Sequence, residues 1–215
     1  MLPYIHMIYP DIELEKKLWN SGKRVVVGLD EVGRGPLAGP VVAGALVISG
    51  EECVVEGVRD SKKMSLKQRE RSYDLIVEKS TAYGIGVVSS DEIDRIGIKY
   101  AVLAAMREAV SQVESKLGST VDYIIADGGI YPLRDHDMDI LNKGDMYHYS
   151  IAGASVLAKV TRDRMMASYA TIYPMYGFER NVGYGTKEHI EAIQKFGICE
   201  IHRKTFEPIK SMLRD

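Results

Sequence analysis

The sequence predicts an α/β fold, in which helices cover both faces of a central sheet and a helical extension follows at the C-terminal end. Short Val-rich runs bounded by Gly and Pro are typical of strands that are buried on both faces. Longer segments with helical periodicity come between and after these runs, and this alternation predicts a sheet covered by helices. The chain has 215 residues, of which 46% are hydrophobic and 27% are charged, so it is long enough to form one main domain.

Four runs have the character of strands. The first two, RVVVGLD and GPVVAGALVI, flank the segment EVGRGPLA, whose two glycines and proline exclude regular structure. The third run has strand character despite two glycines, and the fourth is VDYIIAD. The predicted strands cover residues 24–30, 39–48, 81–89 and 121–127.

Helical periodicity follows the strands along the chain. Ser65 is a candidate N-cap for the first helix, and Gly118 marks the end of the second. The third helix has small residues on its first turns, which permit close packing on a sheet. The predicted helices cover residues 65–80, 96–117, 150–173, 187–197 and 206–213. We expect a single domain with a helical lead-in over about 1–22, an α/β core over about 23–173 and a helical region over about 174–215.

Composition excludes several classes of protein. The net charge of −2, from 28 Lys and Arg against 30 Asp and Glu, gives no overall positive field, so a nucleic acid would have to be bound locally. Two cysteines exclude a disulfide framework and favour a reducing compartment. The chain shows no signal sequence and no apolar run of about 18 residues. We therefore expect a soluble cytoplasmic protein and, by default, a monomer.

Acidic residues stand at the ends of the predicted strands. Asp30 and Glu31 follow the first strand, Asp127 ends the fourth, and Asp145 precedes the helix at 150–173. Carboxylates in such places are costly unless they are paired or bind a cation, and a divalent metal is the usual remedy for their mutual repulsion. Oxygen ligands favour Mg²⁺ or Mn²⁺ over zinc. Taken singly, each acid is also compatible with a helix cap, a turn or an exposed ion pair.

Asp30 and Glu31 are neighbours, and neighbouring residues on a regular strand point to opposite faces. They can share one cation only if the strand ends or twists there, and Gly33 and Gly35 favour such an end. Two metal ions about 4 Å apart would activate a water and stabilise the leaving oxygen in phosphodiester hydrolysis. The acids are therefore compatible with metal-dependent phosphodiester hydrolysis.

A series of motifs runs in order along the chain. These are GLDEVGRGPLAGPVVAGALVI (28–48), DSKKMSLKQRE (60–70), ADGG (126–129), KGD (143–145), SIAGASVLAKVTRDRMM (150–166), YPMYGF (173–178), GYGTKEH (183–189) and IHRKTFEPIK (201–210). In this order they resemble the motif series of the ribonuclease HII family, over roughly residues 12–212. The DSKK and HRKTFEP forms are more similar to the bacterial branch of that family.

The resemblance implies an RNase H-like fold, with a mixed five-stranded sheet flanked by helices and a small helical C-terminal region. It also implies an endonuclease that uses Mn²⁺ or Mg²⁺ to hydrolyse the RNA strand of RNA/DNA hybrids and to cut 5′ of single ribonucleotides in duplex DNA. Such an enzyme removes ribonucleotides and primers. Carried over position by position, the metal-binding residues are Asp30, Glu31, Asp127 and Asp145.

The same resemblance assigns a set of substrate-binding residues. These are Gly33, Arg34, Gly35, Lys62, Lys63 and Tyr184. The Gly-Arg-Gly loop would sense the 2′-OH through its backbone, because glycine lets the main chain approach a sugar closely. The tyrosine would pack against the sugar at the junction between RNA and DNA. The two lysines precede a Ser-capped helix, a place that suits a phosphate group.

Three further basic residues are expected to line the same face. They are Lys143, Lys159 and Arg162, although Arg162 and Asp163 equally fit charges on the surface of a helix. The chain departs from the family pattern at Asn181 and Val182, where His-Lys is common, and at Gly129, where Asn is common. Because one positive charge beside the tyrosine is lost, we expect weaker or more salt-sensitive binding of the duplex.

Two alternatives are compatible with the fold. An RNase H-like nuclease could use the same acids on a different nucleic acid, although the intact Gly33–Gly35 loop and Tyr184 argue against it. A catalytically silent nucleic-acid-binding module would be expected to have lost at least one carboxylate, and none of the four is lost. The segment SMLRD carries no QxxxxFF-like motif for binding a sliding clamp.

Overall fold

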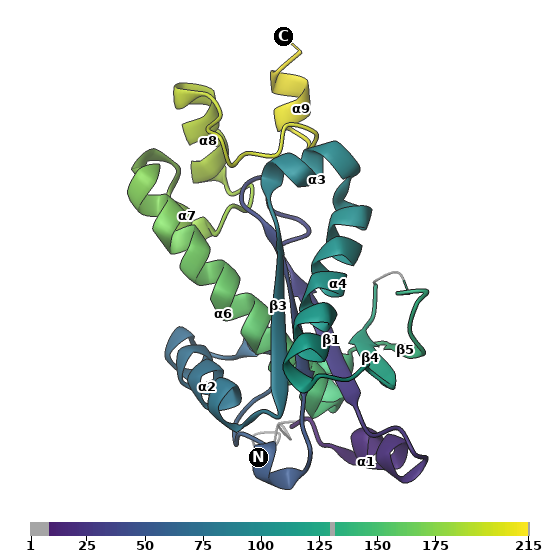
Figure 1. Cartoon of the computed structure of the whole chain (residues 1–215). Coiled ribbons are helices and arrows are strands. Elements are labelled where there is room, and N and C mark those ends of the chain that lie inside the picture. The colour runs from purple at the N-terminus through teal and green to yellow at the C-terminus, as the bar shows by residue number, and fades with distance from the viewer. Residues whose placement is uncertain (1–8, 130–131, 215) are drawn as a thin grey trace, which may run out of the picture.

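The structure is a computed structural model that describes residues 9–129 and 132–214, with a five-stranded sheet at its centre (Figure 1). The strands are β1 (Val26–Val32), β2 (Val41–Val47), β3 (Ala82–Val88), β4 (Tyr123–Asp127) and β5 (Met138–Leu141). Their order is β3-β2-β1-β4-β5. Strand β2 pairs antiparallel with both β1 and β3, whereas β4 pairs parallel with both β1 and β5. The expected mixed sheet is confirmed. Its fifth strand lacks an apolar run because β5 is an edge strand with exposed side chains.

Helices cover both faces of this sheet, as expected. They are α1 (Glu13–Asn20), α2 (Leu66–Lys79), α3 (Ser90–Ile96), α4 (Ile98–Leu117), α5 (Gly144–Tyr147), α6 (Tyr149–Ile172), α7 (Phe178–Asn181), α8 (Lys187–Phe196) and α9 (Ile209–Met212). Helix α4 packs on β2 and β3, whereas α6 packs on β1 and β2 from the other side and carries α2 on its outer surface (Figure 1). Among the described residues, no helix is long and apolar enough to cross a membrane.

Two predicted helices differ from the structure. The segment 96–117 does not form one helix from its first residue, because Gly97 has a φ of 83° and separates α3 from α4. A left-handed residue of this kind ends a helix. The segment 206–213 is helical only over α9, which begins after Pro208, a residue with no N–H group to donate.

The glycines of β3 explain how α4 lies so close to the sheet. A Cβ atom at Gly84 would lie 2.0 Å from the carbonyl oxygen of Ala109, and one at Gly86 would lie 1.8 Å from that of Ala105. These distances are far below van der Waals contact. The glycines therefore do not weaken the prediction of a strand, since they let the helix backbone rest directly on it.

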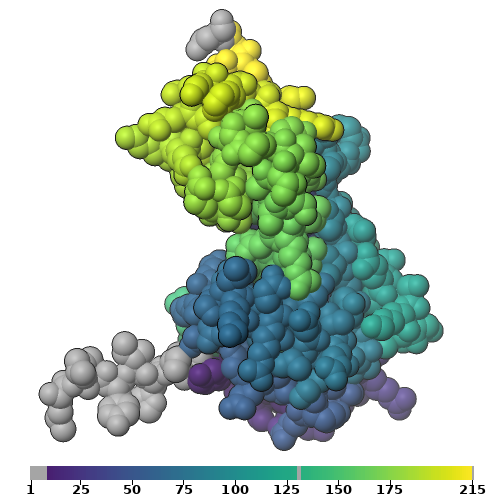
Figure 2. All heavy atoms as spheres, turned by 90° about the vertical axis from the view of Figure 1, so that its left-hand side faces the viewer, coloured from purple at the N-terminus to yellow at the C-terminus, as the bar shows by residue number. Residues whose placement is uncertain are grey.

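Helices α7, α8 and α9 lie in a C-terminal lobe, which we define as residues 174–214. Its own apolar cluster includes Phe178, Ile193 and Ile209. Figure 2 shows a hollow between this lobe, in yellow and light green, and the body that carries α2, in blue. A groove of about 380 Å³ lies there between α2, α6 and residues 179–182.

Candidate active site

The four predicted acids come from three elements that meet at one edge of the sheet. Asp30 and Glu31 lie on β1, and Asp127 ends the parallel neighbour β4. Because Leu29 is opposite Ala126 in the register, Asp30 and Asp127 follow side by side. Asp145 lies on α5, where the backbone N–H of the preceding Gly144 donates to Oδ1 of Asp127 at 2.6 Å. The fold therefore gathers carboxylates from segments that are as much as 115 residues apart in the chain.

The first strand does not end at Asp30, and this part of the sequence analysis was wrong. Strand β1 continues through Glu31 to Val32, with Asp30 opposite Gly44 and Glu31 opposite Ala43 on β2. The backbone N–H of Glu31 donates to Oδ1 of Asp30 at 2.8 Å. The pairing with β2 extends the strand past both acids, and a sequence pattern does not show where such pairing stops.

Burial and mutual repulsion raise the pKa values of three of these carboxyls. The pKa of Asp30 is raised well above its ordinary value by burial and then by the charge of Glu31, and its side chain is only 8% exposed. Burial raises the pKa of Glu31 to about 7, although Arg34 opposes the shift. The pKa of Asp145 is also raised, first by burial and then by Asp127. The site therefore concentrates negative charge in a poorly solvated place.

The donor set fits a hard divalent cation. All four side chains offer carboxylate oxygens, and Oε2 of Glu31 is buried without a hydrogen-bond partner. Within residues 9–129 and 132–214, however, no three acidic, His or Cys side chains are close enough to form a finished cation site. Two competing contacts account for part of this, since Arg34 Nη1 binds Oε1 of Glu31 at 3.2 Å and Gly144 binds Asp127. Small side-chain rotations would be needed to close the four acids on an ion.

The predicted Gly-Arg-Gly loop lies directly beside these acids. Gly33 has a φ of 94°, and a Cβ atom there would lie 2.4 Å from Nε of Arg162. The guanidinium of Arg34 also donates to the carbonyl oxygen of Gly129 at 2.8 Å. A Cβ atom at Gly35 would lie 3.7 Å from Cε1 of Tyr184, so the loop and the tyrosine ring are neighbours. The tyrosine is 46% exposed and available to a ligand.

Arg162 was predicted either to line the substrate face or to be a charge on the surface of a helix, and both predictions were wrong. Its side chain is fully buried and donates to the carbonyl oxygens of Pro40, Ala38 and Val182 at 2.9, 3.1 and 2.8 Å. Burial lowers its pKa to about 10. Its partners lie up to 124 residues away in the chain, so helical periodicity could not reveal them.

Arg203 has a similar role that the sequence analysis missed. Its buried guanidinium donates to the carbonyl oxygens of Gly33, Arg34 and Gly39 at 2.6 to 3.0 Å. Burial lowers its pKa to about 9, and the charge of Arg162 adds to this shift. Arg203 thus holds the Gly-Arg-Gly loop by its backbone from behind, and Arg162 holds the segment that follows it at Ala38 and Pro40. The only sequence signal was the His-Arg pair in IHRKTFEPIK.

The basic residues predicted around the site separate into two groups. Lys62 and Lys63 lie on a short 3-10 turn, where Lys63 pairs with Asp60 at 3.5 Å, and the charges of both lysines oppose the rise in the pKa of Asp145. The predicted Ser cap of α2 is confirmed, since Ser65 and Gln68 cap the helix reciprocally.

The other lysines have different surroundings. Lys159 pairs with Asp163 at 2.7 Å in the groove beside α2, and Asp163 is also 3.7 Å from Arg69. Lys143 adopts a left-handed conformation, with a φ of 58°, directly before α5. Within the described residues, neither lysine forms a hydrogen bond or ion pair with the four acids.

The three departures from the family pattern have structural partners of their own. Asn181 is buried, donates to the carbonyl oxygen of Tyr176 at 2.7 Å and accepts from the N–H of Gly183 at 2.8 Å. Val182 has a φ of 43°, which is unusual for a β-branched residue. Gly129 is left-handed as well, and its carbonyl oxygen binds Arg34. The backbone around Tyr184 is therefore held without the missing histidine.

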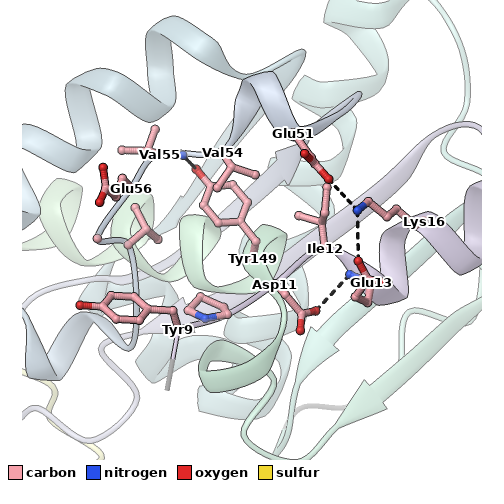
Figure 3. Close-up of a pocket in the computed structure, with 13 residues that line it drawn as sticks. Tyr9, Asp11, Ile12, Glu13, Lys16, Glu51, Val54, Val55, Glu56 and Tyr149 are labelled. Carbon is pink, nitrogen blue, oxygen red and sulfur yellow. Dashed lines mark hydrogen bonds and ion pairs between the residues drawn. The ribbon is translucent and has the colours of Figure 1, made fainter. Parts of the chain in front are cut away.

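A pocket of about 630 Å³ lies away from all of these residues, beside α1 and the start of α6 (Figure 3). Its polar groups bind one another: Lys16 pairs with Glu13 and Glu51, and the hydroxyl of Tyr149 accepts from the N–H of Val55 at 2.7 Å. None of the four acids and none of the predicted substrate-binding residues lines it. The pocket therefore has no part in the candidate active site.

Comparison with known proteins agrees with this geometry. The family model described as ribonuclease HII matches residues 27–209. Ribonuclease HII of Bacillus subtilis (strain 168) is 50% identical over 197 residues, which is 92% of this chain and 75% of the relative.

Solved structures share the fold. The ribonuclease H2 from Pyrococcus horikoshii OT3 aligns with a TM-score of 0.72 and 26% identity, over 88% of this chain and 97% of that one. Bst-RNase HIII in complex with Mn²⁺ aligns with a TM-score of 0.68 over 89% of this chain and 70% of that one, but at 20% identity it shows the fold alone. Since the family model and a close relative both cover most of the sequence, the chain belongs to the ribonuclease HII family and is a ribonuclease H.

Proposed function

We propose that this ribonuclease H is a metal-dependent endonuclease that hydrolyses the RNA strand of RNA/DNA hybrids and cuts 5′ of a single ribonucleotide in duplex DNA. The products would carry a 3′-OH and a 5′-phosphate. The observation that carries the proposal is the position of the four acids directly beside the Gly33–Gly35 loop and the exposed Tyr184. The residues proposed to hold the metal ions thus lie next to the residues proposed to bind the sugar.

The acids would hold one or two Mn²⁺ or Mg²⁺ ions. Asp30, Glu31, Asp127 and Asp145 are the proposed ligands, and the unpartnered Oε2 of Glu31 supports this assignment. Such ions, when bound, activate a water and stabilise the charge on the leaving oxygen. The Mn²⁺ complex of Bst-RNase HIII is in keeping with a divalent ion in this fold. The raised pKa values of Asp30 and Glu31 describe the crowding that a cation would relieve.

The backbone of the Gly-Arg-Gly loop is the proposed reader of the 2′-OH. Only this hydroxyl distinguishes a ribonucleotide from its deoxy neighbours. Because Arg203 occupies the carbonyl oxygens of Gly33 and Arg34 from the buried side, the orientation of these peptide groups is set before a substrate arrives. A site that is organised in advance discriminates better, since little ordering is left to occur on binding.

Tyr184 and the paired lysines complete the proposed substrate contacts. The ring of Tyr184 would pack on the sugar next to the ribonucleotide, beside Gly35. Lys62 and Lys63 would bind a phosphate close to Asp145, whose pKa already responds to their charge. In the cell, an enzyme of this kind would remove misincorporated ribonucleotides and RNA primers in the cytoplasm.

The decisive experiment uses an end-labelled DNA duplex with one ribonucleotide. It is incubated with the protein in Mg²⁺, in Mn²⁺ and in EDTA, beside an all-DNA duplex and a continuous RNA/DNA hybrid. We expect a single metal-dependent cut 5′ of the ribonucleotide and no cut in the all-DNA control. Digestion of the hybrid alone would show that the acids work while the loop and Tyr184 do not read a single ribonucleotide. Cleavage of the all-DNA duplex would instead favour a nuclease with another substrate.

A further inference from the structure

A chain of hydrogen bonds runs through the interior of the C-terminal lobe and ends at Tyr184. Nδ1 of His189 lies 2.8 Å from the carbonyl oxygen of Tyr184, and its Nε2 lies 3.0 Å from Nε2 of His202. The backbone N–H of Cys199 donates to Nδ1 of His202 at 2.9 Å. Both imidazoles are fully buried, and the ring of Phe178 lies against each of them. We call His189 and His202 the histidine pair.

The two ends of this chain specify where its protons lie. A carbonyl oxygen only accepts, so Nδ1 of His189 carries a proton and Nε2 of His189 is an acceptor. His202 must then donate from Nε2, which leaves its Nδ1 as an acceptor. The backbone N–H of Cys199 only donates, and it requires the same acceptor at Nδ1 of His202. The carbonyl oxygen of Cys199 lies farther from this Nδ1, at 3.3 Å, so the shorter contacts at the two ends favour the same arrangement, with both rings neutral and each in a single tautomer.

The surroundings keep both rings neutral. Burial lowers the pKa of His189, and burial together with the neighbouring ring lowers the pKa of His202 to about 4. A second proton on His189 would place two N–H groups face to face between the imidazoles, only 3.0 Å apart, and a second proton on His202 would face the N–H of Cys199 at 2.9 Å. The pair is thus a rigid, directional link at neutral pH, and a freely rotating side chain could not provide one.

The segment around His202 is also bound to the loop that carries the Gly-Arg-Gly motif. The N–H of Arg203 donates to the carbonyl oxygen of Leu37 at 2.8 Å, and the N–H of Gly39 donates to that of Ile201 at 2.9 Å. His202 lies between these two contacts, opposite Ala38 in an isolated bridge. The backbone is also linked directly at this place, since the N–H of Leu37 donates to the carbonyl oxygen of Gly183 at 2.8 Å. The histidine pair adds a second, buried connection, from the carbonyl oxygen of Tyr184 to the segment that pairs with the loop at Ala38.

We propose that His189 and His202 are positioning residues that set the distance between Tyr184 and the Gly33–Gly35 loop, and thereby the preference for a single ribonucleotide over a continuous hybrid. This inference rests on the proposed function, in which the tyrosine and the loop contact the same sugar. A single ribonucleotide requires both contacts at one junction, whereas a continuous hybrid offers many ribose positions. Loss of the link should therefore lower activity on the single ribonucleotide more than activity on the hybrid.

Two substitutions at one position separate positioning from mere packing. In His189→Asn the amide nitrogen takes the place of Nδ1 and can still donate to Tyr184, whereas in His189→Gln the amide reaches the Nε2 position and serves His202 instead. Each variant loses one buried hydrogen bond, so the two should be destabilised to a similar extent. We expect His189→Gln to lower the ratio of kcat/KM for the single ribonucleotide to kcat/KM for the hybrid about tenfold, and His189→Asn to lower it less than about threefold.

Two controls accompany these variants. Ile209→Val removes a methyl group from the same apolar cluster without touching the histidine pair, and it should leave the ratio unchanged. In a Tyr184→Ala background, His189→Gln should have no further effect on the ratio, because the group that it positions is gone. Equal ratios in His189→Gln, His189→Asn and the unaltered protein would overturn the proposal, as would an additive effect in the Tyr184→Ala background.

A spectroscopic measurement examines the pair independently of the substrate. The ¹⁵N shifts of the imidazole nitrogens in the full chain should show a protonated Nδ1 in His189 and a protonated Nε2 in His202. The carbonyl ¹³C shift of Tyr184 should move in His189→Gln and not in His189→Asn. The opposite tautomers would refute the link itself. If the tautomers are as expected but the unaltered protein does not cut at a single ribonucleotide, the proposed function fails and the role of the pair in selectivity fails with it.

Discussion

At the edge of the sheet, Asp30 and Glu31 are buried negative charges with few partners, whereas beside the C-terminal lobe Arg162 and Arg203 are buried positive charges whose guanidinium nitrogens all donate to carbonyl oxygens. The acids have raised pKa values and an unpartnered oxygen, and the arginines have a full set of hydrogen bonds.

The difference separates two uses of buried charge. Where the backbone must be held, carbonyl oxygens satisfy the charge from within the fold, and nothing is left for a ligand. At the carboxylate edge, where we propose that a cation is bound, the charges are left in mutual repulsion that a cation or protonation can relieve.

The largest effect is expected at the carboxylate edge. Asp127→Asn should lower kcat by about 10² to 10³-fold or more, because an amide does not supply the charge that divalent ions need and their contribution is several kcal/mol. Circular dichroism should show an unchanged fold. Asp137→Asn, at a side chain that is 74% exposed on the same part of the chain, is the control and should retain activity. Metal-dependent cleavage that survives in Asp127→Asn would remove this residue from the site.

A second substitution tests the buried arginines, whose charge is satisfied by carbonyl oxygens. Arg203→Lys should lower the free energy of unfolding by about 2–4 kcal/mol, because a single ammonium group cannot serve the carbonyl oxygens of Gly33, Arg34 and Gly39 together. Urea denaturation measures the loss, and Arg24→Lys at an exposed position is the matched control. A loss no larger than in the control would mean that the guanidinium does not hold the loop.

The histidine pair predicts how stability depends on pH. Both pKa values are lowered in the folded protein, so the contribution is fully present above the unfolded value of about 6.5 and is lost as the pH falls toward about 4. The neighbouring Tyr176 and Cys199 have raised pKa values and stay neutral throughout, and Arg203 stays charged. We expect a loss of about 2–3 kcal/mol between pH 7 and pH 4.

The comparison protein for this measurement is His202→Gln. The raised pKa values at the carboxylate edge act in the opposite direction, since protonation there relieves repulsion as the pH falls. The difference between the unaltered protein and His202→Gln cancels that contribution. A pH dependence that is the same in both proteins would show that this histidine does not titrate on unfolding.

Tyr184→Ala tests the proposed contact between this exposed ring and the substrate. Loss of a ring that stacks on the substrate is worth about 1–3 kcal/mol, so cleavage at a single ribonucleotide should fall by roughly tenfold or more with the fold unchanged. Tyr100→Ala is the control, because that ring is 60% exposed on α4. An equal loss on the continuous hybrid would indicate a general packing role for Tyr184 and not a role in selectivity.

The smallest effect has the opposite sign. Asp30→Asn should raise the free energy of unfolding of the metal-free protein by about 1 kcal/mol, because it removes one of several repelling charges. Calorimetry with EDTA and then with Mg²⁺ measures this gain and its reversal, since the ion should stabilise the unaltered protein and not the variant. A destabilised metal-free variant would mean that the hydrogen bonds of Asp30 to Ser155 and to the N–H of Glu31 stabilise the fold more than the repulsion by its charge destabilises it.

Much of the architecture could be predicted from local patterns. Four strands and the helices α2, α6 and α8 lie within a few residues of their predicted bounds, because apolar period and capping residues are local properties. The edge strand β5 had no such pattern, and its existence followed only from the resemblance. The break at Gly97 shows the limit of periodicity, since a long apolar pattern does not reveal where one residue turns left-handed.

By itself, the sequence determined the order of strands and helices, the four acids at strand and loop ends, and the Gly-Arg-Gly motif beside them. The tertiary structure was needed to show that β1 continues past its acids, that Arg162 is buried, and that Arg203, His189 and His202 lie buried behind the Gly33–Gly35 loop and Tyr184. Their partners are main-chain groups as much as 170 residues away. Every residue has a carbonyl oxygen, so a sequence carries no mark of which one a buried side chain will bind, and folding alone makes that choice.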